Sequence, residues 1–267
     1  MGRGILAAAV AALSVAAAAP AAVQAAVARR STSSNWAGYA VSGTGKHFKR
    51  VSATWVQPTV TCDAPRSSAA YWVGLGGFHS TSNALEQIGT EADCSFDGAV
   101  QYRAWYEMVP SDSVTIPLTV QPGDTVFASV TVVGRSVRVA IADRTTGATF
   151  TRTLHPSVLD TTSADWIAEA PSTCFGSSTC VVEPLANFGS VSFASARATS
   201  TTGHAGPISD SAWSATVIDM AADAGPPGFR PGDRFAGALG LKEATTGPLS
   251  ASGDGFAVTV AGASPST

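Results

Sequence analysis

The chain of 267 residues has few charged side chains, and lysine is especially scarce. Asp, Glu, Lys and Arg make up 13% of the residues, about half of the usual share, and the lysines are Lys46, Lys49 and Lys242. The formal net charge is −3 and no basic cluster occurs, so no nucleic-acid partner is expected. A fold with few ion pairs also has little to lose when its carboxylates are protonated, which favours tolerance of acid.

Several catalytic and cofactor signatures are missing. The sequence has no Cys-x-x-Cys, no His-Glu-x-x-His and no Gly-x-Ser-x-Gly motif, and its Gly43–Lys46 stretch lacks the earlier glycine of a phosphate loop. We therefore expect no metal and no cofactor. A Ser–His–Asp triad leaves no such mark, because its members meet only in the fold.

A long apolar run occurs only at the N-terminus. Arg3 precedes an Ala-rich apolar stretch, 5–19, and Val23-Gln24-Ala25 fits a small-residue cleavage site, with Ala22 as the alternative. Residues 1–25 are therefore predicted to be a secretory signal peptide. The mature protein is expected to be extracellular, with no membrane association after cleavage.

The chain has only four cysteines, which in an exported protein predict two disulfides with three possible pairings. Cys174 and Cys180 flank a short Gly-Ser loop, which favours a local bridge. That leaves Cys62 with Cys94, and their bridge would join the two ends of the segment between them.

What the sequence does contain is a series of strand-like segments separated by Gly, Pro, Asp and Ser clusters. Their spacing, without alternating helices, favours a β-sandwich or barrel. Residues 26–34 are expected to be a short unstructured leader, 35–261 a single domain, and 262–267 a tail. The expected strands are 35–42, 47–58, 69–76, 83–91, 98–109, 124–133, 136–143, 147–154, 164–170, 188–199, 212–220, 235–240 and 255–261.

Period-2 alternation gives four of these strands an apolar face and an unusual second face. The second face combines Trp and Gly with amide and carboxylate side chains, which is more typical of a groove for an extended polymer than of an ordinary solvated surface. Glu86 disturbs the pattern, because it falls on the face predicted to be the core. The unusual faces carry Trp72, Gly74 and Gly76; Gln87 and Glu91; Trp105 and Glu107; and Glu169.

These residues leave three functions open. Two of Glu91, Glu107 and Glu169 could serve a glycosidase as acid and as base or nucleophile. One Glu with an amide donor could instead hydrolyse a peptide bond. A lectin that only binds carbohydrate fits the same composition.

Five segments, in their order along the chain, resemble the glutamic peptidases (eqolisins, peptidase family G1). Each segment is short, but the ordered set is specific and, with two later segments, extends over about residues 34–220. The five segments are Asn35-Trp36-Ala37-Gly38-Tyr39, Tyr71-Trp72-Val73-Gly74-Leu75-Gly76-Gly77, Leu85-Glu86-Gln87-Ile88-Gly89-Thr90, Ala104-Trp105-Tyr106-Glu107 and Ala164-Asp165-Trp166-Ile167-Ala168-Glu169.

The resemblance implies an antiparallel β-sandwich of the concanavalin A type and a catalytic dyad of Gln87 and Glu169. It further implies a pepstatin-insensitive endopeptidase that cleaves proteins or peptides at acidic pH. We also expect the protein to be a monomer. The candidate substrate-binding residues are Trp36, Trp72, Gly74, Gly76, Glu91, Trp105 and Glu107.

This chain departs from the fungal enzymes at three positions of the groove region and at its N-terminus. Gly76 and Val109 stand where those enzymes carry Asp and Tyr, and Glu91 stands where they carry Asp. Only about nine residues separate the predicted cleavage site from Asn35, whereas the fungal enzymes have a long pro-segment. The shape of the substrate pocket is therefore expected to differ.

Overall fold

The computed structural model consists of β-strands and connecting loops. It describes residue 1 and residues 29–175, 179–221 and 243–262. The strands are β1 (Arg29–Ser33), β2 (Trp36–Ser42), β3 (Phe48–Val56), β4 (Ser68–Gly76), β5 (Leu85–Cys94), β6 (Val100–Val109), β7 (Val114–Ile116), β8 (Thr125–Val133), β9 (Ser136–Asp143), β10 (Thr149–Leu154), β11 (Ser163–Glu169), β12 (Ser172–Phe175), β13 (Thr179–Val182), β14 (Ser190–Ser200), β15 (Ala205–Pro207), β16 (Ser214–Met220), β17 (Ala244–Thr246) and β18 (Phe256–Val260).

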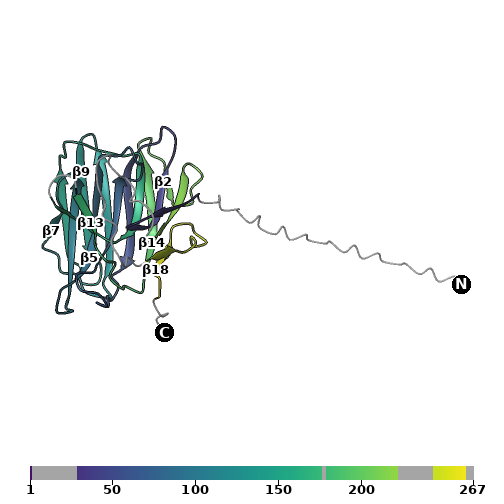
Figure 1. Cartoon of the computed structure of the whole chain (residues 1–267). Helices are drawn as coiled ribbons and strands as arrows, with labels where there is room; N and C mark the ends of the chain where they lie inside the picture. Colours follow the sequence, from purple (N-terminus) through teal and green to yellow (C-terminus); the bar gives the residue numbers. More distant parts are fainter. Residues whose placement is uncertain (2–28, 176–178, 222–242, 263–267) are drawn as a thin grey trace.

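Most strands belong to one sheet that folds over on itself. Its order is β10-β9-β8-β3-β14-β18-β17-β16-β2-β11-β4-β5-β6-β7. The half from β10 to β14 packs against the half from β2 to β7, with β3 and β8 contacting β4 and β5 across the interior (Figure 1). The predicted all-β sandwich is confirmed, and its strand pairs are antiparallel except for β1 with β16.

The space between the two halves holds the main hydrophobic core. Tyr71, Val73 and Leu75 point into it from β4, and Ile88 points into it from β5. Their neighbours in sequence lie on the outer face, as the alternation predicts. The outer face of the half from β2 to β6 carries a second apolar cluster, which is unusual for a surface facing solvent.

The longer strands were predictable, whereas the short ones were not. Residues 29–33, expected within an unstructured leader, form β1 and pair with Thr216–Met220 of β16. This pairing uses backbone hydrogen bonds, so an alternating apolar pattern is not needed. The expected strand at 235–240 and the predicted signal peptide lie outside the described residues.

One predicted disulfide is confirmed directly. Cys62 bonds Cys94, with a sequence separation of 32 residues, and fastens the segment before β4 to the end of β5. Cys180 is also disulfide-bonded, and Cys174 stands opposite it in the register of β12 and β13.

Glycine is required where side chains lie flat across the outer face. Gly89 of β5 stands between Trp72 on β4 and Trp105 on β6. A Cβ atom at Gly89 would lie 2.2 Å from the carbonyl oxygen of Tyr71 and 2.6 Å from the Cβ of Trp72. Strand β4 could not remain in place beside a larger residue.

Gly89→Ala is therefore expected to destabilise the fold by about 1–3 kcal/mol, because the added methyl group meets backbone atoms that cannot move independently. Urea unfolding followed by tryptophan fluorescence measures this change. Gly43→Ala is the control, since its Cβ would meet only the flexible side chain of Lys46. Equal stability of the two variants would contradict the close approach at Gly89.

Candidate active site

The candidate site lies on the outer face of β2, β11, β4, β5 and β6. The second apolar cluster forms its floor, and it brings together indole rings from three strands that are not consecutive in sequence. The cluster contains Trp36, Ala40, Ala70, Trp72, Leu85, Trp105, Ile167 and Ile218, with Phe78 and Val109 packed against it.

Strand register places Gln87 and Glu169 on this face but in different rows. Gln87 of β5 stands opposite Gly74 of β4 and Glu107 of β6. Glu169 of β11 stands opposite Ala70 at the other end of β4. The two expected catalytic residues are thus separated by one strand, β4, and by four residues along it.

Trp72 connects these two rows. Its indole Nε1 donates a hydrogen bond to Oε2 of Glu169 at 2.6 Å. At the other edge of the ring, a Cβ atom on Gly74 would lie 3.0 Å from Cζ3 of Trp72 and 3.3 Å from the Cβ of Gln87. Trp72 is 0% exposed, so its ring supports Glu169 from below rather than forming an open wall of the groove.

Glu169 is half-buried and has a second donor. Asn35 Nδ2 donates to Oε1 of Glu169 at 3.1 Å, and Asn35 is itself held by the hydroxyl of Ser33. Burial raises the pKa of Glu169 to about 8, although the hydrogen bond from Trp72 opposes this change; the charge of Glu107 raises it further. The side chain is therefore a strong base once it has lost its proton.

Gln87 and Glu107 form a close pair across β5 and β6. Gln87 Nε2 donates to Oε2 of Glu107 at 2.5 Å. Gln87 is only 4% exposed, and its Oε1 has no hydrogen-bond partner within the described part of the chain. Burial raises the pKa of Glu107 to about 7, opposed by this hydrogen bond and reinforced by the charge of Asp112.

Glu91 belongs to an ion-pair cluster at the Glu169 end of the face. Arg103 donates from Nε to Oε1 of Glu91 at 3.0 Å and also pairs with Asp93. Burial raises the pKa of Glu91 to about 7, the neighbouring Asp93 adds to this, and Arg103 opposes it. Glu91 therefore already has a cationic partner.

The fold itself requires glycine at position 76, whether or not substrate binds there. Its φ is +80°, and a Cβ atom there would lie 2.6 Å from the backbone oxygen and Cβ of Asp160. The amide of Asp160 in turn donates to Oε1 of Glu86 at 3.3 Å. Burial raises the pKa of Glu86 to about 8, so the residue that disturbed the alternation is a buried acid holding the 159–162 segment against β5.

Two polar residues of the site were not singled out from the sequence. Asn35 contacts Glu169, as described above. Asp165 stands opposite Gly74 in the row of Gln87 and accepts a hydrogen bond from Ser163, and burial raises its pKa well above the usual value. Both lie inside sequence segments that resemble the glutamic peptidases, and this resemblance is the signal that could have identified them as site residues.

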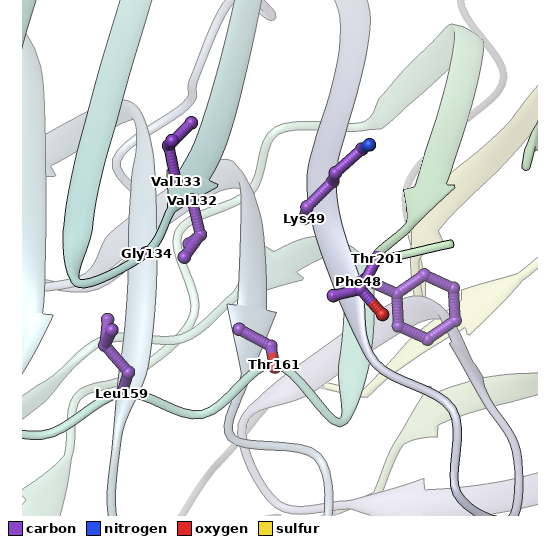
Figure 2. A pocket seen from close by; sticks show the side chains of 8 residues that line it. All are labelled: Phe48, Lys49, Val132, Val133, Gly134, Leu159, Thr161 and Thr201. Carbon is purple, nitrogen blue, oxygen red and sulfur yellow. The ribbon is translucent and has the colours of Figure 1, made fainter. Parts of the chain in front are cut away.

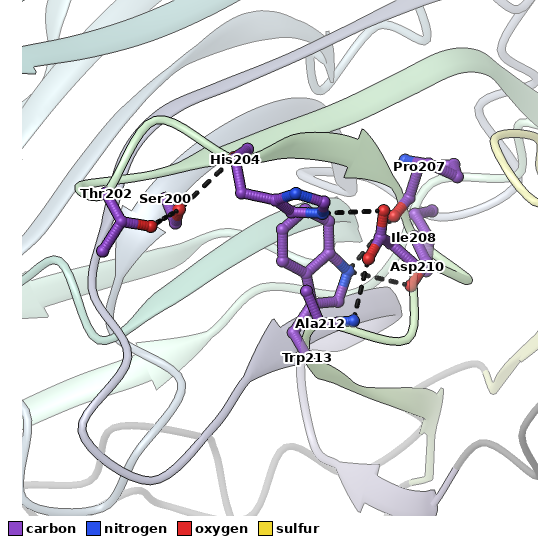
Figure 3. Close-up of polar contacts among 8 residues, drawn as sticks. All are labelled: Ser200, Thr202, His204, Pro207, Ile208, Asp210, Ala212 and Trp213. Carbon is purple, nitrogen blue, oxygen red and sulfur yellow. Dashed lines mark hydrogen bonds and ion pairs between the residues drawn. The ribbon is translucent and has the colours of Figure 1, made fainter.

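A Ser–His–Asp triad is not formed by the polar cluster in Figure 3. His204 Nε2 lies 3.0 Å from Oδ2 of Asp210, and its ring packs edge-on against Trp213. The hydroxyl of Ser200, however, bonds Thr202 and the backbone carbonyl of His204 rather than its imidazole. These contacts fasten the β14–β15 turn.

A cavity of about 570 Å³ lies elsewhere, between the start of β3 and the β8–β9 hairpin (Figure 2). Its lining contains no carboxyl or amide side chain and none of the predicted site residues. Among the described residues no group of three metal-binding side chains is found, nor any helix able to cross a membrane. The cavity is lined by Phe48, Lys49, Val132, Val133, Gly134, Leu159, Thr161 and Thr201.

Three comparisons relate this chain to known proteins. Aspergillopepsin-2 of Aspergillus niger is 33% identical over 215 residues, which cover 72% of this chain and 71% of that protein. The crystal structure of aspergilloglutamic peptidase from Aspergillus niger matches with a TM-score of 0.54 and 30% identity, over 72% of this chain and 98% of the other. Scytalido-glutamic peptidase with a transition state analog inhibitor matches with a TM-score of 0.66 and 25% identity, over 85% and 98%.

The family match agrees with these relatives. Residues 34–225 match the Peptidase A4 family, and this range includes Gln87, Glu107, Glu169 and the three indoles of the apolar cluster. The chain therefore belongs to the Peptidase A4 family, the glutamic peptidases.

Proposed function

We propose that this protein is a secreted endopeptidase in which Glu169 and Gln87 hydrolyse peptide bonds at acidic pH. The single observation that carries the proposal is the hydrogen-bonded placement of Glu169 by Trp72 and Asn35 on the face that also bears Gln87. Family membership supports peptide rather than carbohydrate as the substrate, so the glycosidase and lectin alternatives are set aside.

Glu169 acts first as base and then as acid. Its carboxylate takes a proton from a water molecule that attacks the scissile carbonyl directly, without an acyl-enzyme. The resulting carboxylic acid then gives its proton to the leaving nitrogen. The bonds from Trp72 and Asn35 fix the carboxylate in position during both steps.

Gln87 stabilises the negative charge that develops on the carbonyl oxygen. An amide donor that is already in position costs no reorganisation when the charge appears. The low exposure of Gln87, and its place on β5 between Gly74 and Glu107, keep the side chain on this face.

The working range of pH is limited from both sides. Glu169 must be ionised to accept a proton; burial raises its pKa to about 8 before substrate binds, and the hydrogen bond from Trp72 favours the ionised form. Activity in acid therefore requires that bound substrate lower this pKa, and below the lowered value the ionised fraction falls about tenfold per pH unit. Above neutral pH the buried carboxyls ionise, which weakens the fold. Extracellular location after removal of residues 1–25, a monomeric state and insensitivity to pepstatin complete the proposal.

Glu169→Gln is expected to lower kcat by about 10²–10⁴-fold, because the amide can neither take nor give the proton. Cleavage of a denatured protein at pH 4, with pepstatin present, measures the loss. Glu243→Gln is the matched control, since Glu243 is exposed beside β17. Undiminished digestion by the Glu169 variant would remove Glu169 from the mechanism.

Gln87→Ala is expected to lower kcat by about 10²–10³-fold while leaving KM nearly unchanged, because the lost donor acts mainly in the transition state. Steady-state kinetics on a fluorogenic peptide separates the two constants. Turnover close to that of the unmodified enzyme would reject the oxyanion role.

Stability is expected to be greatest in acid. Glu86, Glu91, Glu107 and Glu169 have folded-state pKa values raised from 4.5 to about 7 or 8. Between these values the folded state binds more protons than the unfolded state, so stability falls as pH rises. Their contribution is complete below about pH 4.5 and is lost as pH passes through about 7 to 8.

The urea midpoint at constant ionic strength should therefore decrease from pH 4.5 to pH 8. Asp143 and Asp160 work in the opposite direction, because their pKa values are lowered and their contribution disappears in stronger acid. A midpoint that rises over this interval would show that the buried carboxyls do not control stability.

A further inference from the structure

We propose that Glu107 is a positioning residue whose proton decides which end of the Gln87 amide faces the substrate. The inference rests on the proposed function, because it concerns the orientation of the oxyanion donor. Glu107 itself does not exchange a proton with the substrate in this scheme.

The two ends of the Gln87 amide have different surroundings. Nε2 donates to Oε2 of Glu107 at 2.5 Å, on the β6 side of β5. The two ends of a planar amide diverge, so Oε1 points away from Glu107, and it occupies a buried position.

This orientation is unsuited to stabilising an oxyanion. Oε1 is a buried acceptor without a hydrogen-bond partner in the described residues, which is costly in a folded protein. A carbonyl oxygen facing the substrate would also repel a developing negative charge. The arrangement suits an ionised Glu107, which can only accept hydrogen bonds.

Rotation of the Gln87 amide by 180° about its last side-chain bond exchanges the two ends without moving other atoms. Oε1 then accepts a hydrogen bond from Glu107, and Nε2 takes the buried position of the oxygen, from which it donates to a substrate carbonyl bound against it. This second orientation requires a donor on Glu107, which only its carboxylic acid form supplies. One proton on Glu107 therefore satisfies the unpartnered oxygen and presents the amide donor at the same time.

The surroundings of Glu107 favour that proton in acid. Burial raises the pKa of Glu107 to about 7, and the negative charge of Asp112, in the segment after β6, adds to this. Among the described residues, the groups that act on Glu107 include no cation. The arginine on its own strand, Arg103, is four residues away and is paired with Glu91 and Asp93. The titratable or charged groups around Glu107 are Glu91 on β5, Arg103 on β6, Asp112 after β6 and Glu169 on β11, while β7 contributes none.

The proton balance of hydrolysis is unaffected by this arrangement. The proton taken from water goes to Glu169 and then to the leaving nitrogen, while the proton on Glu107 stays in place through turnover. Raising the pH removes it, Gln87 turns its oxygen toward the substrate, and kcat falls on the alkaline side.

Glu107→Gln tests the proposal, because glutamine carries an amide donor at every pH. The alkaline limb of kcat is expected to move upward by at least about one pH unit, with KM unchanged within about twofold. Glu107→Met, which has no donor, should lose about tenfold or more in kcat across the whole pH range. Circular dichroism and urea unfolding establish that both variants are folded.

A spectroscopic measurement reports the amide without relying on catalysis. In ¹⁵N-labelled protein the side-chain NH₂ signals of Gln87, assigned through their absence in Gln87→Ala, should shift with pH at the titration midpoint of Glu107. In Glu107→Gln these signals should not titrate over the same range.

Two further variants test the role of the Glu107 proton without changing Glu107 or Gln87. Asp112→Asn removes a charge that raises the pKa of Glu107, so the alkaline limb should move to lower pH. Asp97→Asn makes the same charge change in the exposed turn between β5 and β6 and should leave the profile unchanged.

An unaltered alkaline limb in Glu107→Gln, together with Gln87 signals that still titrate, would overturn the proposal. The dyad would nevertheless stand if Gln87→Ala and Glu169→Gln were inactive. Full activity of those two variants would instead refute the proposed function itself.

Discussion

The contact between the Trp72 indole and Glu169 is the interaction on which the site depends. It requires the ring to lie across the sheet, which is possible because Gly74 and Gly89 have no side chains in its path. It also requires β11 and β4 to pair in the register that brings Ala70 opposite Glu169. The sandwich core fixes that register, since a shift by one residue would exchange the apolar and polar faces of both strands.

Burial of carboxyl groups makes the charge of the site depend on the pH of the solution. Glu91, Glu107 and Glu169 share one face, and burial is the largest cause of the raised pKa of each. Arg103 is the cation paired with these carboxylates among the described residues, and it contacts only Glu91 of the three. Such a face is compatible with folding in acid, where the carboxyls are neutral, and becomes strained when they ionise together.

Much of the fold and part of the site could be predicted from the sequence. Alternation places Gln87, Trp72 and Glu169 on outer faces because a strand has a fixed period of two. It could not show that Trp72 is wholly buried, or that Gly76 is needed for the approach of Asp160. Those features depend on segments that are distant in the chain.

The sequence by itself determined where the longer strands lie, which side chains share a face of each strand, and one directly observed disulfide. Through its ordered short segments it also indicated the family. The tertiary structure decided which polar atoms meet. Asn35 reaches Glu169 across 134 positions, and Glu107 reaches Gln87 across 20. The reason is physical: side-chain periodicity is a local property of the backbone, whereas hydrogen-bond partners and burial, and hence pKa values, follow from which strands become neighbours.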